Sequence, residues 1–185
     1  MNILLFSSIL LALILLVQYF YSIKLLIVFG ITFGFFAIGL NFLFDSCFGA
    51  SSPIDLKTQN LTEQNLKIYA IIFCEDLENG NVNYTKYDSK LEPKKTSKFC
   101  IDNDCGKFWL VAKNEKDEIK YLEEVSNNES KFEFAIRSND KVEIDKVKIA
   151  KELTFKTDKN IRIEKYLLWT NVILILLLVM NLRKN

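Results

Sequence analysis

Two long apolar runs separated by one lysine open the chain, and they limit its fold more than any other feature. Residues 1–23 carry no charged side chain, Lys24 follows, and residues 25–44 are again free of charge. A helix needs about 20 apolar residues to cross the roughly 30 Å hydrocarbon core of a bilayer. Both runs are long enough, and the short joint from Gln18 to Lys24 predicts an antiparallel hairpin of transmembrane helices.

A cleaved signal peptide is the alternative interpretation of the first run. It would need a positively charged start, an apolar stretch of about 7–15 residues and a small-residue cleavage site. Residues 1–23 contain no Lys or Arg, and the apolar stretch continues as far as Val17. The pattern therefore favours a retained membrane helix.

A third run, from Tyr166 to Leu182, is also without charge, and Lys165 and Arg183 bound it. Tyr166 and Trp169 supply aromatic anchors for a membrane interface. We therefore expect three parts: a transmembrane hairpin at 1–44, an extramembrane domain at 45–165, and a third helix with a short basic tail at 166–185.

Charges near the ends of the runs predict the orientation. The hairpin returns the chain to its starting side, so Lys24 shares the opposite side with Arg183 and Lys184. Short basic segments tend to stay in the cytoplasm. The domain at 45–165 is therefore expected to be extracytoplasmic, although basic residues also lie at its end; these are Lys159, Arg162 and Lys165.

Small and polar residues within the runs predict helix contacts. Gly30 and Gly34 are four residues apart, which leaves a flat face for a neighbouring helix. We expect packing against the first helix of the same chain, with self-association as the alternative. Asn41 and Asn171 could each form an interhelical hydrogen bond, although hydration near the interface is the favoured interpretation. The spans contain no ionisable residue, which argues against a proton relay.

The middle domain is predicted to be a small antiparallel β structure, a sandwich or an open barrel. Apolar residues alternate in several short stretches, as in Phe132, Phe134 and Ile136, and Asn- and Gly-rich turns separate them. Residues 45–65 are interpreted as a linker, and 115–124 as a possible short helix. The predicted strands are 66–74, 82–87, 107–112, 131–137, 141–149 and 152–156.

Four cysteines, an even number, favour two disulfides in an extracytoplasmic domain. The expected pairs are Cys100 with Cys105 across a turn, and Cys47 with Cys74, among three formal connectivities. Free buried thiols are an alternative. A zinc site lacks paired C-x-x-C ligands and His, and the Asp-rich turn before Gly106 lacks the downstream ligands of a calcium loop. We therefore expect no metal and no cofactor.

The residue inventory argues against catalysis. The chain contains no His, the commonest general base, and no glycine-rich phosphate loop. The net charge of +1 averages unlike segments, and no nucleic-acid partner is expected. A basic stretch fits a solvated loop or lipid head groups; its members are Lys90, Lys94, Lys95 and Lys98.

The sequence thus predicts a non-enzymatic multi-pass membrane protein, with the bilayer and other membrane subunits, or a second copy, as partners. The leading hypothesis is an accessory or assembly subunit that presents an extracytoplasmic β domain. The alternative is a ligand-sensing effector, whose β domain binds a small molecule in the cytoplasm and whose helices oligomerise.

Overall fold

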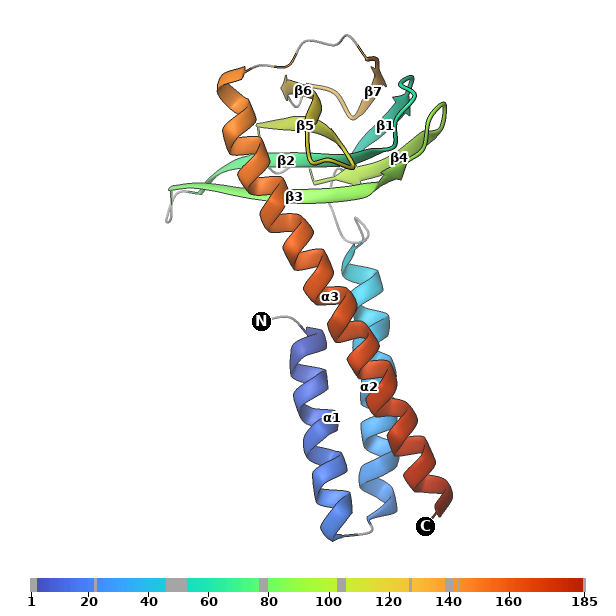
Figure 1. Cartoon of the computed structure of the whole chain (residues 1–185). Coiled ribbons are helices and arrows are strands. Elements are labelled where there is room, and N and C mark those ends of the chain that lie inside the picture. Colours follow the sequence, from blue (N-terminus) through green and yellow to red (C-terminus); the bar gives the residue numbers. More distant parts are fainter. Residues whose placement is uncertain are drawn as a thin grey trace. The chain divides into compact units, whose positions relative to one another are not determined.

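The computed structural model describes residues 3–21, 23–45, 53–76, 80–102, 106–126, 128–138, 142 and 144–184. Along these residues the elements run α1, α2, β1 to β7 and α3 (Figure 1). The chain divides into two compact units. We call Met1–Phe48 with Lys159–Asn185 the helical unit, and Gly49–Asp158 the β unit.

The helical unit contains α1 (Ile3–Phe20), α2 (Lys24–Asp45) and the second part of α3 (Ile144–Lys184). All three helices are long and apolar enough to cross a membrane, judged by length and composition. The joint between α1 and α2 is a tight turn, where Gln18 Nε2 donates a hydrogen bond to the Ile23 carbonyl at 2.6 Å. The predicted apolar hairpin and third apolar helix are confirmed.

Contacts at two glycines establish the helix directions in this unit. A Cβ atom on each glycine would meet one side chain of α1 and one of α3: Ile14 and Leu178 at Gly30, and Leu11 and Ile175 at Gly34. From Gly30 to Gly34 the contacting residues change from Ile14 to Leu11 in α1 and from Leu178 to Ile175 in α3. Helix α2 is therefore antiparallel to both α1 and α3. It follows that α1 and α3 run parallel, and that Lys24 and Arg183 lie at the same end of the unit.

Hydration was the favoured interpretation of Asn171, but the structure confirms the alternative, an interhelical hydrogen bond. Its side chain is fully buried, and its Nδ2 lies 2.9 Å from the Leu4 carbonyl and 2.7 Å from Ser8 Oγ, both on α1. Two neighbouring helices cover it, because Ile175 and Leu178 pack against α1 and α2 on the same side of α3. Asn171 therefore joins α3 to α1 by hydrogen bonds in an otherwise apolar contact.

The β unit contains a sandwich of two sheets, the first of the two alternatives that the sequence predicted. Sheet A has the strand order β4-β1-β7, and its strands are Thr96–Ile101, Ile54–Asn60 and Lys131–Ile136. Sheet B has the order β3-β2-β5-β6, and its strands are Gly80–Leu91, Leu66–Asp76, Lys107–Asn114 and Ile119–Ser126. Sheet B is antiparallel throughout, whereas β1 and β7 pair in parallel.

The core of the β unit lies between the two sheets. Alternate residues of each strand point into it, because successive side chains of a strand face opposite sides. In β2 the inward residues are Leu66, Ile68, Ala70 and Ile72, and in β7 they include Phe134 and Ile136, with Phe132 packed against them. The predicted alternation at 132–136 is confirmed.

The strands predicted at 141–149 and 152–156 are wrong, because α3 begins at Ile144. Val142, Ile144, Val147 and Ile149 suggested an alternation with one shift. The buried and half-buried positions instead recur every three or four residues, at Val147, Ala150, Leu153, Thr154 and Asp158. That spacing belongs to one face of a helix.

Three further interpretations need correction. The assumed linker at 45–65 contains β1, whose outward residues are polar and whose inward residues include only two large apolar side chains, Ile54 and Leu56. The basic stretch ends in β4, which was not predicted as a strand. The possible helix at 115–124 is the turn and second strand of the β5–β6 hairpin, with Asp117 at a φ of 60°.

Replacement of Gly34 by Ala is expected to destabilise the helical unit. The new Cβ would lie 2.7 Å from Ile175 Cδ1 and 2.8 Å from its Cγ1, and Ile175 is buried. Overpacking of this kind costs about 1–3 kcal/mol. Thermal unfolding of the full chain in detergent should show a lower midpoint. Gly39→Ala is the matched control, because nothing lies within 4 Å of its Cβ; equal effects of the two substitutions would contradict the packing argument.

Candidate functional site

The first part of α3 covers the face of sheet B that points away from sheet A. Ala150 and Leu153 of α3 pack there against Tyr69, Val111 and Leu122. Sheet B is therefore buried on both sides, which explains why β5 is buried along seven of its eight residues. The contact between α3 and sheet B contains Lys113, the buried charged residue among those described in the β unit.

A charged cluster closes one end of this contact. Lys113 lies in β5 with only 3% of its side chain exposed, and its Nζ is 2.7 Å from Asp158 Oδ2 on α3. Tyr69 donates a hydrogen bond from its hydroxyl to Asp158 Oδ1 at 2.6 Å, and Lys67 Nζ lies 3.5 Å from Oδ2. We call these four residues the Asp158 cluster. It lies at the last residue of the β unit, and α3 continues from it into the helical unit.

The surroundings shift the ionisation of both oxygen-bearing groups in the cluster. Burial raises the pKa of Tyr69, and the hydrogen bond to the Asp158 carboxylate raises it further. Burial also tends to raise the pKa of Asp158. The hydrogen bonds from Lys113 and Tyr69 and the positive charges of Lys113 and Lys67 outweigh burial, so the pKa of Asp158 lies below its ordinary value. At neutral pH the cluster therefore holds the carboxylate of Asp158 and the neutral phenol of Tyr69.

The Asp158 cluster is not suited to catalysis. Tyr69 is fully buried and both oxygens of Asp158 are already occupied, so no substrate atom could reach a free acid or base. Sequence reasoning missed the cluster. Its only signal was a lysine inside the apolar strand Lys107–Asn114, at a position that faces the same way as Trp109 and Val111.

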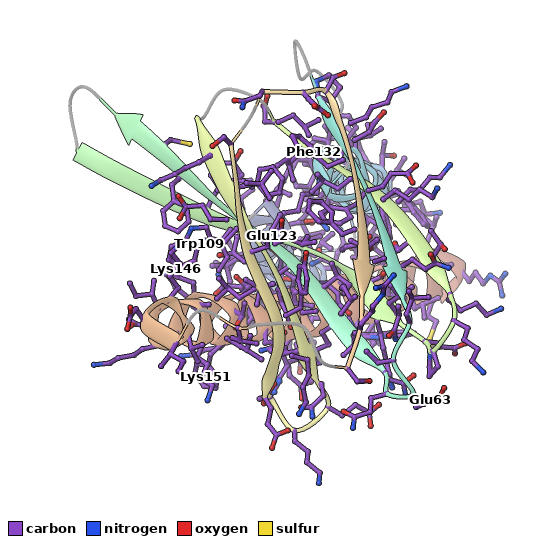
Figure 2. All side chains as sticks on the ribbon, turned by 90° about the horizontal axis from the view of Figure 1, so that it is seen from above. Glu63, Trp109, Glu123, Phe132, Lys146 and Lys151 are labelled. Carbon is purple, nitrogen blue, oxygen red and sulfur yellow. The ribbon has the colours of Figure 1, made fainter. Side chains whose placement is uncertain are left out.

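A second polar contact joins α3 to sheet B nearer the start of the helix. Trp109 Nε1 donates a hydrogen bond to Glu124 Oε2 at 2.9 Å, and Lys146 Nζ lies 2.9 Å from the same oxygen and 5.5 Å from the Trp109 ring centre. These hydrogen bonds, from Lys146 first and Trp109 second, hold the pKa of Glu124 below its ordinary value. Figure 2 shows Lys146 and Trp109 on one side of α3 and Lys151 on the other.

A hollow of about 520 Å³ lies on the outer face of sheet A. Its charged lining includes Lys57 and Glu133, which form an ion pair at 3.0 Å, and the exposed Lys98 and Lys131. Phe99 and Phe132 also border the hollow, although their side chains pack against the core between the sheets. The hollow offers a mixed polar surface to a small molecule.

The cysteines divide between the two faces of the sandwich. Cys74 packs against the core between the sheets, whereas Cys100 lines the hollow on the outer face of sheet A. Both are disulfide-bonded, and no cysteine among the described residues is free. Cys47 and Cys105 lie outside the described residues, so the predicted pairing stays a prediction. The described residues also contain no group of three or more His, Cys, Asp or Glu side chains that could hold a metal ion.

Comparisons with known proteins return no relatives: no family model matches the chain, and no match is found among curated proteins or solved structures. The chain is therefore classified here by its architecture. The chain combines three apolar helices with a small two-sheet β sandwich.

Replacement of Asp158 by Asn is expected to lower the stability of the β unit by about 2–3 kcal/mol, because the buried Lys113 loses its closest carboxylate. The loss stays below that of a fully isolated buried charge, since Asp117 remains 3.3 Å from Lys113. Unfolding in detergent, followed by tryptophan fluorescence in a Trp169→Phe background so that Trp109 alone emits, measures the change. Glu115→Gln is the control, because it removes the exposed Lys90–Glu115 pair, whose loss should leave the stability nearly unchanged.

The same variant has an expected pH signature. A carboxyl whose folded pKa is depressed stabilises the fold above its unfolded pKa, about 3.9, and that stabilisation is lost as the pH falls through the folded pKa. Wild-type stability should therefore decline below about pH 4 more steeply than that of Asp158→Asn. Parallel acid limbs in the two proteins would argue against the cluster.

Proposed function

We propose that this chain is a non-enzymatic, membrane-anchored accessory or assembly subunit whose β unit binds another subunit of a membrane complex. The observation that carries the proposal is a set of exposed apolar side chains on the first part of α3. Five large apolar side chains are exposed among the described residues of the β unit, and three of them lie on this helix segment; these are Ile144, Ile149 and Phe155.

The arrangement of these side chains favours a protein partner. Ile144 is 85% exposed and Phe155 is 67% exposed, although the opposite side of the same helix segment is packed on sheet B. Single exposed apolar residues are common, but apolar patches are typical of interaction sites, and Ile144 and Phe155 project within about 20° of each other on the helix. A partner that covered them would bury apolar area in the way that stable subunit contacts do.

The polar chemistry of the β unit supports a binding role rather than a reaction. The Asp158 cluster and the Glu124–Lys146–Trp109 contact use their charges to hold α3 on sheet B. The chain has no His to act as a general base.

The location we propose is extracytoplasmic for the β unit and cytoplasmic for the Lys24 turn and the C-terminal tail. Two observations support this orientation. Lys24 and Arg183 lie at the same end of the helical unit, where the positive-inside tendency favours the cytoplasm. Cys74 and Cys100 are disulfide-bonded, which suits an oxidising compartment.

A ligand-sensing effector is the second candidate, and the hollow on sheet A favours it. The hollow has the volume of a small-molecule site and a mixed lining. In that candidate the helices would self-associate, whereas Gly30 and Gly34 already face side chains of α1 and α3 within the chain. We therefore rank it below the subunit role.

Purification of the tagged full chain in mild detergent tests the proposed function. The expected result is a discrete complex of fixed stoichiometry, whose mass is measured by light scattering and whose members are identified by mass spectrometry. Phe155→Ser should reduce partner recovery at least about tenfold, because hot-spot residues at an interface contribute roughly 2 kcal/mol or more.

Leu61→Ser is the matched control, because Leu61 is an exposed apolar residue of the β unit outside α3; it should leave recovery unchanged. A lone wild-type monomer would contradict the subunit role. A homo-oligomer that retains a small molecule would favour the sensing candidate instead.

Non-reducing peptide mapping is expected to find two disulfides, with Cys74 and Cys100 in different ones. The reason is that Cys74 faces the core and Cys100 faces outward, so their sulfurs point to different sides of the sandwich. The favoured pairs remain Cys100–Cys105 and Cys47–Cys74. A Cys74–Cys100 peptide would contradict the prediction, and pairs Cys47–Cys100 and Cys74–Cys105 would correct the connectivity alone.

A further inference from the structure

The exposed face of α3 changes character where the polar part of the helix meets its charge-free part. Arg162, Lys165, Tyr166 and Trp169 all project from this face, since a helix turns about 100° per residue and these positions fall within an arc of about 100°. Along the axis they span about 10 Å, at 1.5 Å per residue. Tyr166 is 68% exposed and Trp169 is 65% exposed, and Arg162 and Lys165 are exposed as well.

These four side chains all end in hydrogen-bond donors: a guanidinium, an ammonium, a phenol hydroxyl and an indole N–H. Within the described residues, Arg162 and Lys165 lie in none of the ion pairs, which involve other residues. The nearest acid along the helix is Glu164, which projects about 200° from Arg162 and about 100° from Lys165. The strip is therefore a set of donors aimed outward, with net positive charge.

After Trp169, the same face of α3 is apolar and exposed. Ile173, Leu176 and Met180 continue it toward the C-terminal end, and each is more than half exposed. The opposite face of α3 is packed, because Asn171, Ile175 and Leu178 lie against α1 and α2. The outward face thus has two parts: residues 162–169 carry positive charge and hydrogen-bond donors, and residues 173–180 are apolar.

The chemistry of this face matches one class of partner. A phospholipid has an anionic phosphate that accepts hydrogen bonds, joined to acyl chains that prefer apolar side chains. Trp and Tyr favour the head-group level of a bilayer, and basic residues beside a span attract anionic lipids. A second copy of the chain fits less well, because it would bring the Arg162 and Lys165 charges of two helices together.

We propose that the outward face of α3 is a binding site for an anionic phospholipid. Arg162, Lys165, Tyr166 and Trp169 hold the head group, and Ile173, Leu176 and Met180 contact the acyl chains. The site also explains the basic residues that immediately precede the charge-free part of α3. Under the positive-inside rule they oppose the expected orientation, whereas as lipid ligands they have a role on either side of the membrane.

Quenching of Trp169 by brominated lipids tests the site in the full chain. Trp109 is replaced by Phe, so that Trp169 is the remaining tryptophan, and the protein is reconstituted in phosphatidylcholine vesicles. A small, equal fraction of brominated phosphatidylglycerol or brominated phosphatidylcholine is then added. A basic residue near the surface is worth about 1 kcal/mol toward anionic lipid, or roughly fivefold. Brominated phosphatidylglycerol should therefore quench Trp169 at several-fold lower mole fraction.

The pair Arg162→Gln and Lys165→Gln should remove this preference and leave quenching by phosphatidylcholine unchanged. The matched control is Lys24→Gln with Arg183→Gln, which removes two basic residues at the opposite end of the helical unit; it should keep the preference at Trp169. Equal quenching by the two lipids in the wild-type background would overturn the site. A preference that survives Arg162→Gln with Lys165→Gln would overturn the assignment of its ligands.

Trp109→Phe removes a hydrogen bond to Glu124 and could impair folding, so a second measurement uses the chain with Trp109 intact. The protein is released from mixed vesicles into detergent, and bound phospholipid is counted by native mass spectrometry. The expected result is phosphatidylglycerol retained by the wild type and by the control pair, and lost from Arg162→Gln with Lys165→Gln. Equal retention in all three proteins would overturn the proposal.

Discussion

A lysine can remain in an apolar interface only if a carboxylate is held against it, and in the β unit the carboxylate comes from the last residue of the helix segment. Lys113 is buried near the end of β5, an inner strand of sheet B, and Asp158 reaches it from α3. The attraction offsets part of the cost of removing both charges from water, and the hydrogen bond from Tyr69 occupies the second carboxylate oxygen. The pair therefore requires α3 to lie on sheet B in one register, because a shift by one residue would carry Asp158 about 100° around the helix.

The helical unit meets the same requirement with neutral groups. Asn171 is buried among apolar residues, where an unpaired amide would cost several kcal/mol, and the Leu4 carbonyl and Ser8 hydroxyl of α1 lie within hydrogen-bond distance of its Nδ2. Its Oδ1 finds no partner among the described residues. One helix thus carries a charged anchor in the β unit and an amide anchor in the helical unit. Each suits its surroundings, since an ion pair is far more costly in hydrocarbon than an amide.

Features set by long runs of one residue type could be predicted from the sequence. Charge-free runs identified α1, α2 and the end of α3, and strict alternation identified β7, because both signals repeat over many residues. The start of α3 was misassigned as strand. Apolar residues in 142–149 fit both the two-residue period of a strand and the period of a helix, and the contact with sheet B, which the sequence does not show, selects the helix. β1 was missed since its outward residues are polar and its inward residues include Thr58 and Asn60, which are buried through contacts formed only in the fold. Asn60 is held by hydrogen bonds from its side chain to the Gln64 and Leu91 carbonyls, which the sequence does not reveal.

The distribution of charge within the β unit limits where its function can reside. Its buried charges are occupied in joining α3 to sheet B, and a group held in this way cannot also change partners during a reaction without loosening the fold. What remains accessible is of a different kind: apolar side chains on the outer side of α3 and the mixed lining of the hollow on sheet A. Such surfaces gain energy by excluding water from a partner, which needs shape and apolar area and no activated side chain. Among the described residues, this distribution of charge and apolar surface fits the binding role proposed above.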